Sequence, residues 1–233
     1  MSTAEYDDDS ESDRSPDALD IAPSHGGVRV DRVVTSGTFE LDGGSWQVDN
    51  NVWVIGDERE CIVIDAAHDA EAILAAVDGR TVRAILLTHG HNDHINAATE
   101  LGAATNAPIH LHREGRVLWA LSQDTPPPDD IVDGQEFHIG DVMLRALHTP
   151  GHSPGACSFH ASAMHVVFTG DTLFQGGPGA TGRSFSSFDL IIESITEKLL
   201  TLPSGTVVLT GHGEATTIGA EAPQLDEWIA RGH

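Results

Sequence analysis

Histidine and aspartate crowd into one short segment of this chain, directly after an apolar run. The segment Thr88–His94 reads THGHNDH, and the apolar residues before it are typical of a buried strand. His89 and His91 are two residues apart, so in extended backbone they point to the same side, and Asp93 and His94 begin the next expected helix. Four imidazole or carboxylate ligands within six residues are hard to explain without metal. The segment therefore predicts a fold in which a buried strand ends at a metal site.

Three further candidate ligands stand singly, each next to a glycine at the end of an apolar segment. Glycine permits the tight backbone that lets loops from different strands approach one point. The expected strands before them are Val142–His148, Met164–Thr169 and Thr206–Thr210, and the candidates that follow are His152, Asp171 and His212. Together with the THGHNDH segment, they predict that several strand ends meet at one metal centre.

Strand-like and helix-like segments follow in the same order in both halves of the chain. Strand clusters followed by helices, twice, suggest two sheets packed face to face with helices outside, in one domain over residues 26–233. Pro126–Pro128 is expected to mark the crossing between the halves, and Ala161–Ala163 a hairpin connection. The other expected strands are Val28–Thr35, Thr38–Leu41, Gln47–Ile55, Cys61–Ile64, Val82–Leu87, Pro108–His112, Gln135–Ile139 and Ala156–His160; the expected helices are Asp69–Val77, Asn92–Thr105, Arg113–Leu121, Phe188–Leu200 and Pro223–Ala230.

The charge of the chain is strongly negative and unevenly spread. Against 36 Asp and Glu there are 12 Lys and Arg, a formal net charge of −24. Residues 1–20 carry eight acids and one base, so we expect residues 1–25 to form a disordered acidic tail. Binding to nucleic acid or to an anionic membrane needs a basic face, which this composition does not supply. Both are therefore excluded as expected partners.

The sequence also bears on the compartment. No apolar run approaches the roughly 18 residues of a membrane-spanning helix. The first residues, MSTAEYDDDSESD, have neither the basic nor the apolar region of a secretory signal. Two cysteines, Cys61 and Cys157, are too few for a disulfide framework, which fits a reducing environment. We therefore expect a cytoplasmic protein, with Cys157 as a packing residue.

The complete order of motifs resembles that of a known family. His-x-His-x-Asp-His, then Pro-Gly-His, Gly-Asp-Thr and Gly-His-Gly, is similar to the pattern of the metallo-β-lactamase superfamily, over about residues 28–233. The resemblance implies an α+β fold, a four-layer αββα sandwich with the metal site at one edge of the two sheets. Gly170–Phe174 followed by Gly182–Ser184 resembles the glyoxalase II branch, whose members hydrolyse thioesters such as hydroxyacyl-glutathione.

The resemblance also implies a binuclear metal site and a reaction. It implies two divalent ions, Zn(II) in the first instance with Fe or Mn as alternatives, since imidazole-rich sites suit all three. The implied reaction is hydrolysis of a small-molecule thioester by a metal-bridging hydroxide, with Asp93 and Asp171 as catalytic residues. The implied ligands are His89, His91 and His152 for the first ion, Asp93, His94 and His212 for the second, and Asp171 as the bridge.

Four other residues near the motifs have expected roles. Asp65 matches an early aspartate of the superfamily that orients a metal-ligand histidine, although a strand-end aspartate can also simply cap a turn. Arg183 is expected to contact an anionic group of the substrate, with a structural arginine as the equal alternative. His68 and His148 are interpreted as structural.

Several related activities are disfavoured and one stays open. The helical C-terminal region that carries much of the glutathione contact in glyoxalase II is absent from this pattern, so another thiol carrier is possible. Lactonases with an active-site tyrosine are disfavoured because Tyr6 is the only tyrosine, and β-lactamases because Asp171 stands where several of them carry cysteine. The open alternative is a mononuclear iron persulfide dioxygenase, whose ligand set is a subset of this one. A non-catalytic metal-binding protein of this family would lack some of the metal ligands, whereas all seven positions are filled here.

Overall fold

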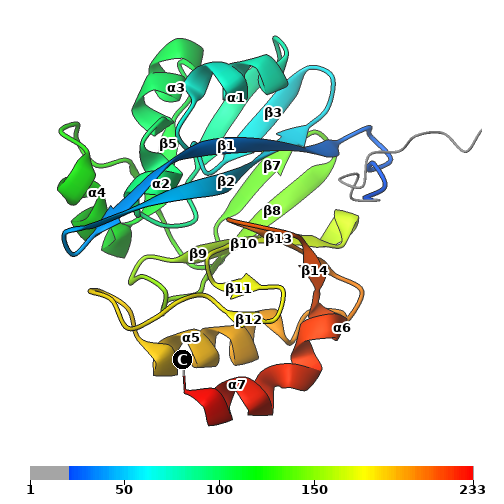
Figure 1. Ribbon diagram of the computed structural model, residues 1–233. Coiled ribbons are helices and arrows are strands. Elements are labelled where there is room, and N and C mark those ends of the chain that lie inside the picture. The colour runs from blue at the N-terminus through cyan, green and yellow to red at the C-terminus, as the bar shows by residue number, and fades with distance from the viewer. Residues whose placement is uncertain (1–20, 233) are drawn as a thin grey trace, which may run out of the picture.

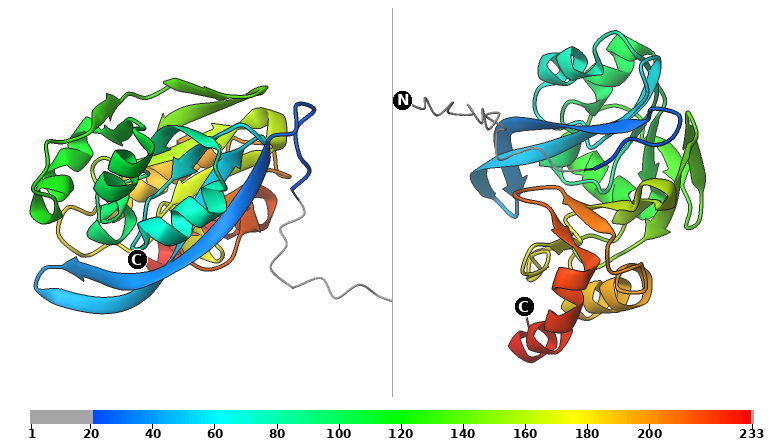
Figure 2. Two further views of the ribbon diagram at one scale, coloured as in Figure 1. Left: turned by 90° about the horizontal axis from the view of Figure 1, so that it is seen from above. Right: turned by 90° about the vertical axis from the view of Figure 1, so that its right-hand side faces the viewer.

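Each half of the chain forms one large sheet, and the two sheets pack face to face with helices on both outer faces (Figures 1 and 2). The structure, a computed structural model, describes residues 21–232. The first sheet has the order β1 (Arg29–Leu41), β2 (Gly44–Gly56), β3 (Glu60–Ile64), β4 (Thr81–Leu86), β5 (Ile109–His112), β6 (Asp129–Ile131). The second has the order β14 (Thr216–Thr217), β13 (Val207–Thr210), β10 (Val166–Gly170), β9 (Cys157–Ala161), β8 (Val142–His148), β7 (Glu136–Ile139). The expected αββα sandwich is confirmed.

Apolar side chains on both faces of the central strands hold the four layers together. In β2, Trp53 and Ile55 belong to the core between the sheets, whereas Val52 and Val54 belong to the core under the helices. A strand buried on both faces needs a continuous apolar run, which explains the sequence of this segment. The first sheet is covered by α1 (Ala70–Val77), α3 (Ala98–Thr105) and α4 (Arg116–Ser122); the second is covered by α5 (Phe188–Ser194), α6 (Ile218–Glu221) and α7 (Leu225–Arg231) (Figure 1).

The β1–β2 hairpin is longer than the sequence predicts. The two strands expected at Val28–Thr35 and Thr38–Leu41 form one, because pairing with β2 continues through Ser36 and Gly37. Its turn consists of Asp42 and Gly43, both with positive φ, as a two-residue turn of type I′ requires. The hairpin extends along one side of the sandwich (Figure 2).

Two connections differ from expectation for reasons of hydrogen bonding. Pro126–Pro128 do not mark the crossing, because β6 follows them and still pairs with β5 in the first sheet. The helix expected at Asn92–Thr105 divides into α2 (Asn92–Ile95) and α3, because the N–H of Ala97 donates to the carbonyl of Ala66 instead of continuing the helix.

Smaller differences concern the second half. The hairpin connection expected at Ala161–Ala163 is present, because β9 and β10 pair antiparallel across it, but it is a 3₁₀ turn, Ser162–Met164, so β10 starts at Val166 rather than Met164. Helix α5 continues as a π-helical turn, Ile195–Leu199, and 3₁₀ turns precede α4 (Arg113–Gly115) and α7 (Ala222–Gln224). The short pair β11 (Leu173–Phe174) and β12 (Gly177–Pro178) and strand β14 have no counterpart in the sequence analysis.

The expected tail falls mostly outside the described residues, which begin at residue 21. Residues 21–25 lie against the fold: Ile21 packs on the core between the sheets, and the Ser24 hydroxyl donates to Asp141. Within the described part of the chain, no helix combines the length and apolar character needed to cross a bilayer. Cys157 is buried in the core, and burial raises the pKa of its thiol, which fits the expected packing role.

Candidate metal centre

All seven expected ligands come together at one edge of the sandwich, where several strands end. His89 and His91 lie in the loop after β4, Asp93 and His94 lie in α2, and the others follow β8, β10 and β13. The side chains form two groups, which share Asp171 as a neighbour. We call His89, His91 and His152 the first cluster, and Asp93, His94 and His212 the second cluster.

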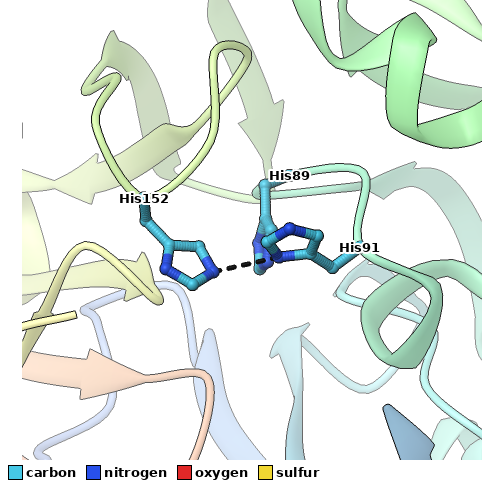
Figure 3. Close-up of side chains that lie close together, drawn as sticks. All are labelled: His89, His91 and His152. Carbon is cyan, nitrogen blue, oxygen red and sulfur yellow. Dashed lines mark hydrogen bonds between the residues drawn. The ribbon is translucent and has the colours of Figure 1, made fainter. Parts of the chain in front are cut away.

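The first cluster consists of three imidazoles that face one another (Figure 3). Their ligand atoms lie within 4.8 Å of one another. Nε2 of His152 is 3.0 Å from Nδ1 of His91, and the ring of His89 stands edge-on to both other rings. Three imidazole nitrogens converging from two loops is an arrangement suited to Zn, Fe or Mn.

The second cluster combines one carboxylate with two imidazoles. Nε2 of His94 is 3.2 Å from Nε2 of His212, which is 3.4 Å from Oδ2 of Asp93. Ligand atoms at tetrahedral positions about 2.1 Å from a cation stand roughly 3.4 Å apart. These separations therefore match a set of ligands around one ion.

Asp171 lies between the two clusters. Its Oδ2 is 3.6 Å from Nε2 of His152 and 3.4 Å from Nε2 of His212, and its Oδ1 is 3.4 Å from Nε2 of His94. One carboxylate thus reaches ligand atoms of both clusters. The sequence analysis expects Asp171 in this position.

Outward hydrogen bonds turn one nitrogen of most of these rings toward the centre. Nδ1 of His152 lies 2.9 Å from the carbonyl of Ala180, and Nδ1 of His212 lies 2.7 Å from the carbonyl of Asp49. A carbonyl can only accept, so each Nδ1 carries a proton, and in the neutral ring the lone pair lies on Nε2, facing the centre. This is the tautomer that a metal-binding histidine needs.

Asp65 and Thr88 hydrogen-bond to the outward-facing nitrogens of ligands in the two clusters. Asp65 Oδ2 is 3.0 Å from Nδ1 of His94 and accepts from the Thr88 hydroxyl at 2.7 Å. The same hydroxyl lies 3.0 Å from Nδ1 of His89. The contact expected of Asp65 is therefore present, and Thr88 extends it to the first cluster.

Several buried polar atoms at this centre have no hydrogen-bond partner among the described residues. They are Nε2 of His89, and Oδ1 of Asp93 and of Asp171. Leaving such atoms buried and unpaired costs about 1–3 kcal/mol each, and more for charged groups. Bound cations would satisfy ligand atoms of this kind, so the donor set fits a binuclear metal site.

The two clusters differ in protonation. In the first, burial lowers the pKa of His89 well below its usual value and, with His152 adding to the effect, that of His91 to about 3. In the second, burial opposes the charged form, but Asp171 outweighs it and raises the pKa of His212 to about 10. His94 beside Asp93 likewise has a pKa well above its usual value. In the metal-free protein, protons on His94 and His212 therefore compensate the negative charge of Asp93 and Asp171, which bound cations would otherwise compensate.

Glycine precedes three of the ligands because a side chain would not fit there. A Cβ on Gly211 would lie 2.3 Å from Oδ1 of Asp171, and one on Gly170 would lie 2.3 Å from the Thr88 hydroxyl. A Cβ on Gly151 would lie 2.2 Å from the backbone nitrogen of Ile191. The glycines noted in the sequence thus let the loops approach closely enough to assemble the centre.

A cavity of about 170 Å³ opens onto the centre. One wall is apolar and comes from the β1–β2 hairpin, and Arg183 also lines the cavity, with its guanidinium against that hairpin. The guanidinium of Arg183 lies 3.9 Å from the ring centroid of Trp46, a cation–π contact with the hairpin. The hairpin residues of the wall are Phe39, Leu41 and Val48.

Asn50, for which no role was expected from the sequence, lies beside the second cluster. It is fully buried on β2, and its side-chain nitrogen is 3.1 Å from Oδ2 of Asp93. Next to it, Asn51 donates to the carbonyls of Thr210 and Gly213 and so fixes the loop that carries His212. A signal was available, because two adjacent amides directly precede the apolar run Val52–Ile55 of an expected buried strand.

The fold and the site define a metal-binding αββα sandwich, and comparison with known proteins gives its family. The model of the metallo-beta-lactamase superfamily matches residues 46–212. The probable metallo-hydrolase YqgX of Bacillus subtilis is 35% identical over 75% of this chain and 90% of its own length. The hydroxyacylglutathione hydrolase GloC of Haemophilus influenzae is 32% identical over 71% of this chain and 85% of its own. The chain therefore belongs to the metallo-β-lactamase superfamily.

Solved structures agree on the fold. BLEG-1, a B3 metallo-beta-lactamase, has a TM-score of 0.68 at 32% identity and covers 81% of this chain and 97% of its own. TTHA1623 in a di-iron-bound form has a TM-score of 0.67 at 30% identity, with the same coverage. ETHE1 from Myxococcus xanthus has a TM-score of 0.67 at 26% identity and covers 86% of this chain and 89% of its own.

Proposed function

We propose that this protein is a binuclear metal-dependent hydrolase that cleaves a thioester of a low-molecular-weight thiol. One observation carries the proposal: the Asp171 carboxylate lies between two converging sets of ligand atoms, several of them buried and without a partner. The identity to GloC, whose name states hydroxyacylglutathione hydrolysis, supports a thioester as substrate.

The proposed ligands are those assembled at the centre. Two divalent cations, Zn(II) in the first instance with Fe or Mn as alternatives, would supply a water of lowered pKa and positive charge toward a developing oxyanion. The first cluster would hold one ion, the second cluster the other, and Asp171 both.

The chain's own residues have the remaining tasks. Oδ1 of Asp93 is buried and unpaired, so it can orient or receive a proton at the reacting water. The wall formed by Phe39, Leu41 and Val48 packs against an acyl group and excludes bulk water. Arg183, which lines the cavity, provides a positive charge for an anionic group of the thiol carrier.

Metal analysis with an activity panel tests the proposal. We expect about two ions per chain and hydrolysis of at least one thioester in a panel that varies the thiol carrier. Arg183→Gln should raise KM for anionic carriers and leave kcat nearly unchanged, because a contact made equally in ground and transition states affects binding alone. A chain with two ions that hydrolyses no thioester would refute the proposed substrate class.

A mononuclear iron persulfide dioxygenase is the second candidate. The di-iron-bound form of TTHA1623, at 30% identity, supports iron as a metal for this fold but, with two ions, not a mononuclear site. One iron per chain with oxygen consumption on a persulfide would support this candidate. The complete second cluster favours the binuclear hydrolase.

A further inference from the structure

Three side chains form a hydrogen-bonded path that ends on a ligand of the second cluster. The path runs from Asn96 at the end of α2, through His68 in the loop before α1, to Asn50 on β2 and then to Asp93. We infer that this path positions Asp93 and sets the metal affinity of the second cluster selectively. The inference rests on the proposed binuclear metal site.

One unambiguous donor fixes the direction of every bond in the path. The backbone N–H of His68 donates to Oδ1 of Asn96 at 2.5 Å, so the side-chain nitrogen of Asn96 must be the atom 2.9 Å from Nδ1 of His68. Nδ1 is therefore an acceptor, and the His68 proton lies on Nε2. Nε2 donates to Oδ1 of Asn50 at 2.9 Å, which leaves the Asn50 nitrogen facing Asp93.

The surroundings hold the middle of this path in place. His68 has a positive φ of 59°, a conformation that histidine tolerates better than most residues. Its ring lies under Gly37 of β1, where an added Cβ would come within 2.1 Å of Nδ1. Asn50 is fully buried. Neither side chain is free to reorient without moving the hairpin.

The path determines which oxygen of Asp93 is engaged. Oδ2, the oxygen that lies 3.4 Å from Nε2 of His212 among the ligand atoms of the second cluster, accepts from Asn50, while Oδ1 is buried without a hydrogen-bond partner. The Asn50 nitrogen also lies 3.3 Å from Nε2 of His94 and 3.5 Å from Nε2 of His212. A reversed amide would place its oxygen against these atoms instead. In the first cluster, by contrast, the outer hydrogen-bond partner of His89 Nδ1 is the Thr88 hydroxyl, and that of His152 Nδ1 is the Ala180 carbonyl.

A pair of substitutions at His68 tests the inference. His68→Asn keeps a residue that tolerates positive φ but is too short to reach Asn50, whereas His68→Gln offers an amide nitrogen near the position of Nε2. With Zn²⁺ titrated into the metal-free chain against a chromophoric chelator, we expect His68→Asn to weaken the second ion by about 10- to 100-fold, as loss of an outer partner usually does. The first ion should change by less than about twofold, and His68→Gln should restore most of the second-ion affinity.

A control and an independent measurement complete the test. His160→Asn changes another partly buried histidine, on β9, and should leave both affinities unchanged. In the unsubstituted metal-free chain, ¹⁵N NMR should show His68 with its proton on Nε2. Equal weakening of both ions, an unchanged second ion in His68→Asn, or a proton on Nδ1 would overturn the inference. A chain that binds no second ion at all would refute the proposed function as well.

Discussion

The two clusters lie side by side around the same aspartate, yet they solve the problem of buried charge differently. The first cluster contains imidazoles alone, and burial keeps His89 and His91 neutral by lowering the pKa of each. The second contains Asp93, and the neighbouring carboxylates raise the pKa of His94 and His212, so these rings hold protons instead. The first cluster therefore presents lone pairs at neutral pH, whereas the second must lose protons to accept a cation.

Replacing the shared carboxylate should have the largest effect, because it removes the one group common to both clusters. Loss of a residue that only hydrogen-bonds to a metal ligand lowers metal affinity or activity by about 10- to 100-fold. Asp171 is itself an expected ligand, so we expect Asp171→Ala to reduce thioester hydrolysis by at least about a hundredfold and to lower the content of both ions. Metal analysis and initial rates measure this, with Asp189→Ala on the exposed surface of α5 as the control. Unchanged metal content and hydrolysis would show that the binuclear arrangement is wrong.

A matched pair of substitutions should separate the clusters. We expect His152→Ala to lose mainly the first ion and His212→Ala mainly the second, each leaving about one ion per chain, because each removes a ligand from one cluster alone. Metal content per chain and a Zn²⁺ titration of each variant measure the result. If both variants lose both ions equally, the clusters act as a single unit and the comparison fails.

A second pair tests the support behind the ligands. Asp65→Asn should weaken both ions by about tenfold or more, because Asp65 contacts His94 directly and His89 through Thr88. Thr88→Val removes the hydroxyl at nearly constant volume and should weaken mainly the first ion. Titration of both variants with Zn²⁺ measures this. An effect of Thr88→Val confined to the second ion would contradict the assigned contacts.

The pH dependence of metal binding should differ between the clusters. The pKa of His212 rises from 6.5 to about 10, so its ring is protonated at neutral pH and a cation must displace that proton. Second-ion affinity should therefore increase with pH up to about 10, by about tenfold per unit for each proton displaced. The pKa of His91 is about 3, so the first-ion affinity should be nearly flat above about pH 5. Calorimetry in buffers of different ionisation enthalpy counts the protons; equal release at both steps would contradict this difference.

Much of the fold and the ligand set could be predicted because the signals are local. His89 and His91 alternate at a strand end, and each single ligand follows an apolar strand and a glycine. The continuous β1 strand and the late crossing after β6 could not be predicted, because pairing with a neighbouring strand, rather than local composition, decides where a strand ends. Asn50 was missed for a related reason: its function depends on side chains 43, 44 and 162 residues away.

The sequence by itself determined which residues assemble at the candidate metal centre and in what order, since the THGHNDH segment and the three residues that follow glycines are contiguous patterns. The tertiary structure alone decided the tautomer, the orientation and the pKa of those side chains. Nδ1 of His212 finds its acceptor in the carbonyl of Asp49, 163 residues away, and the amide of Asn50 takes its orientation from His68. The physical reason is that a tautomer or an amide orientation depends on partners brought close only by packing, and the same packing shifts the pKa of each ligand by burial and by neighbouring charge.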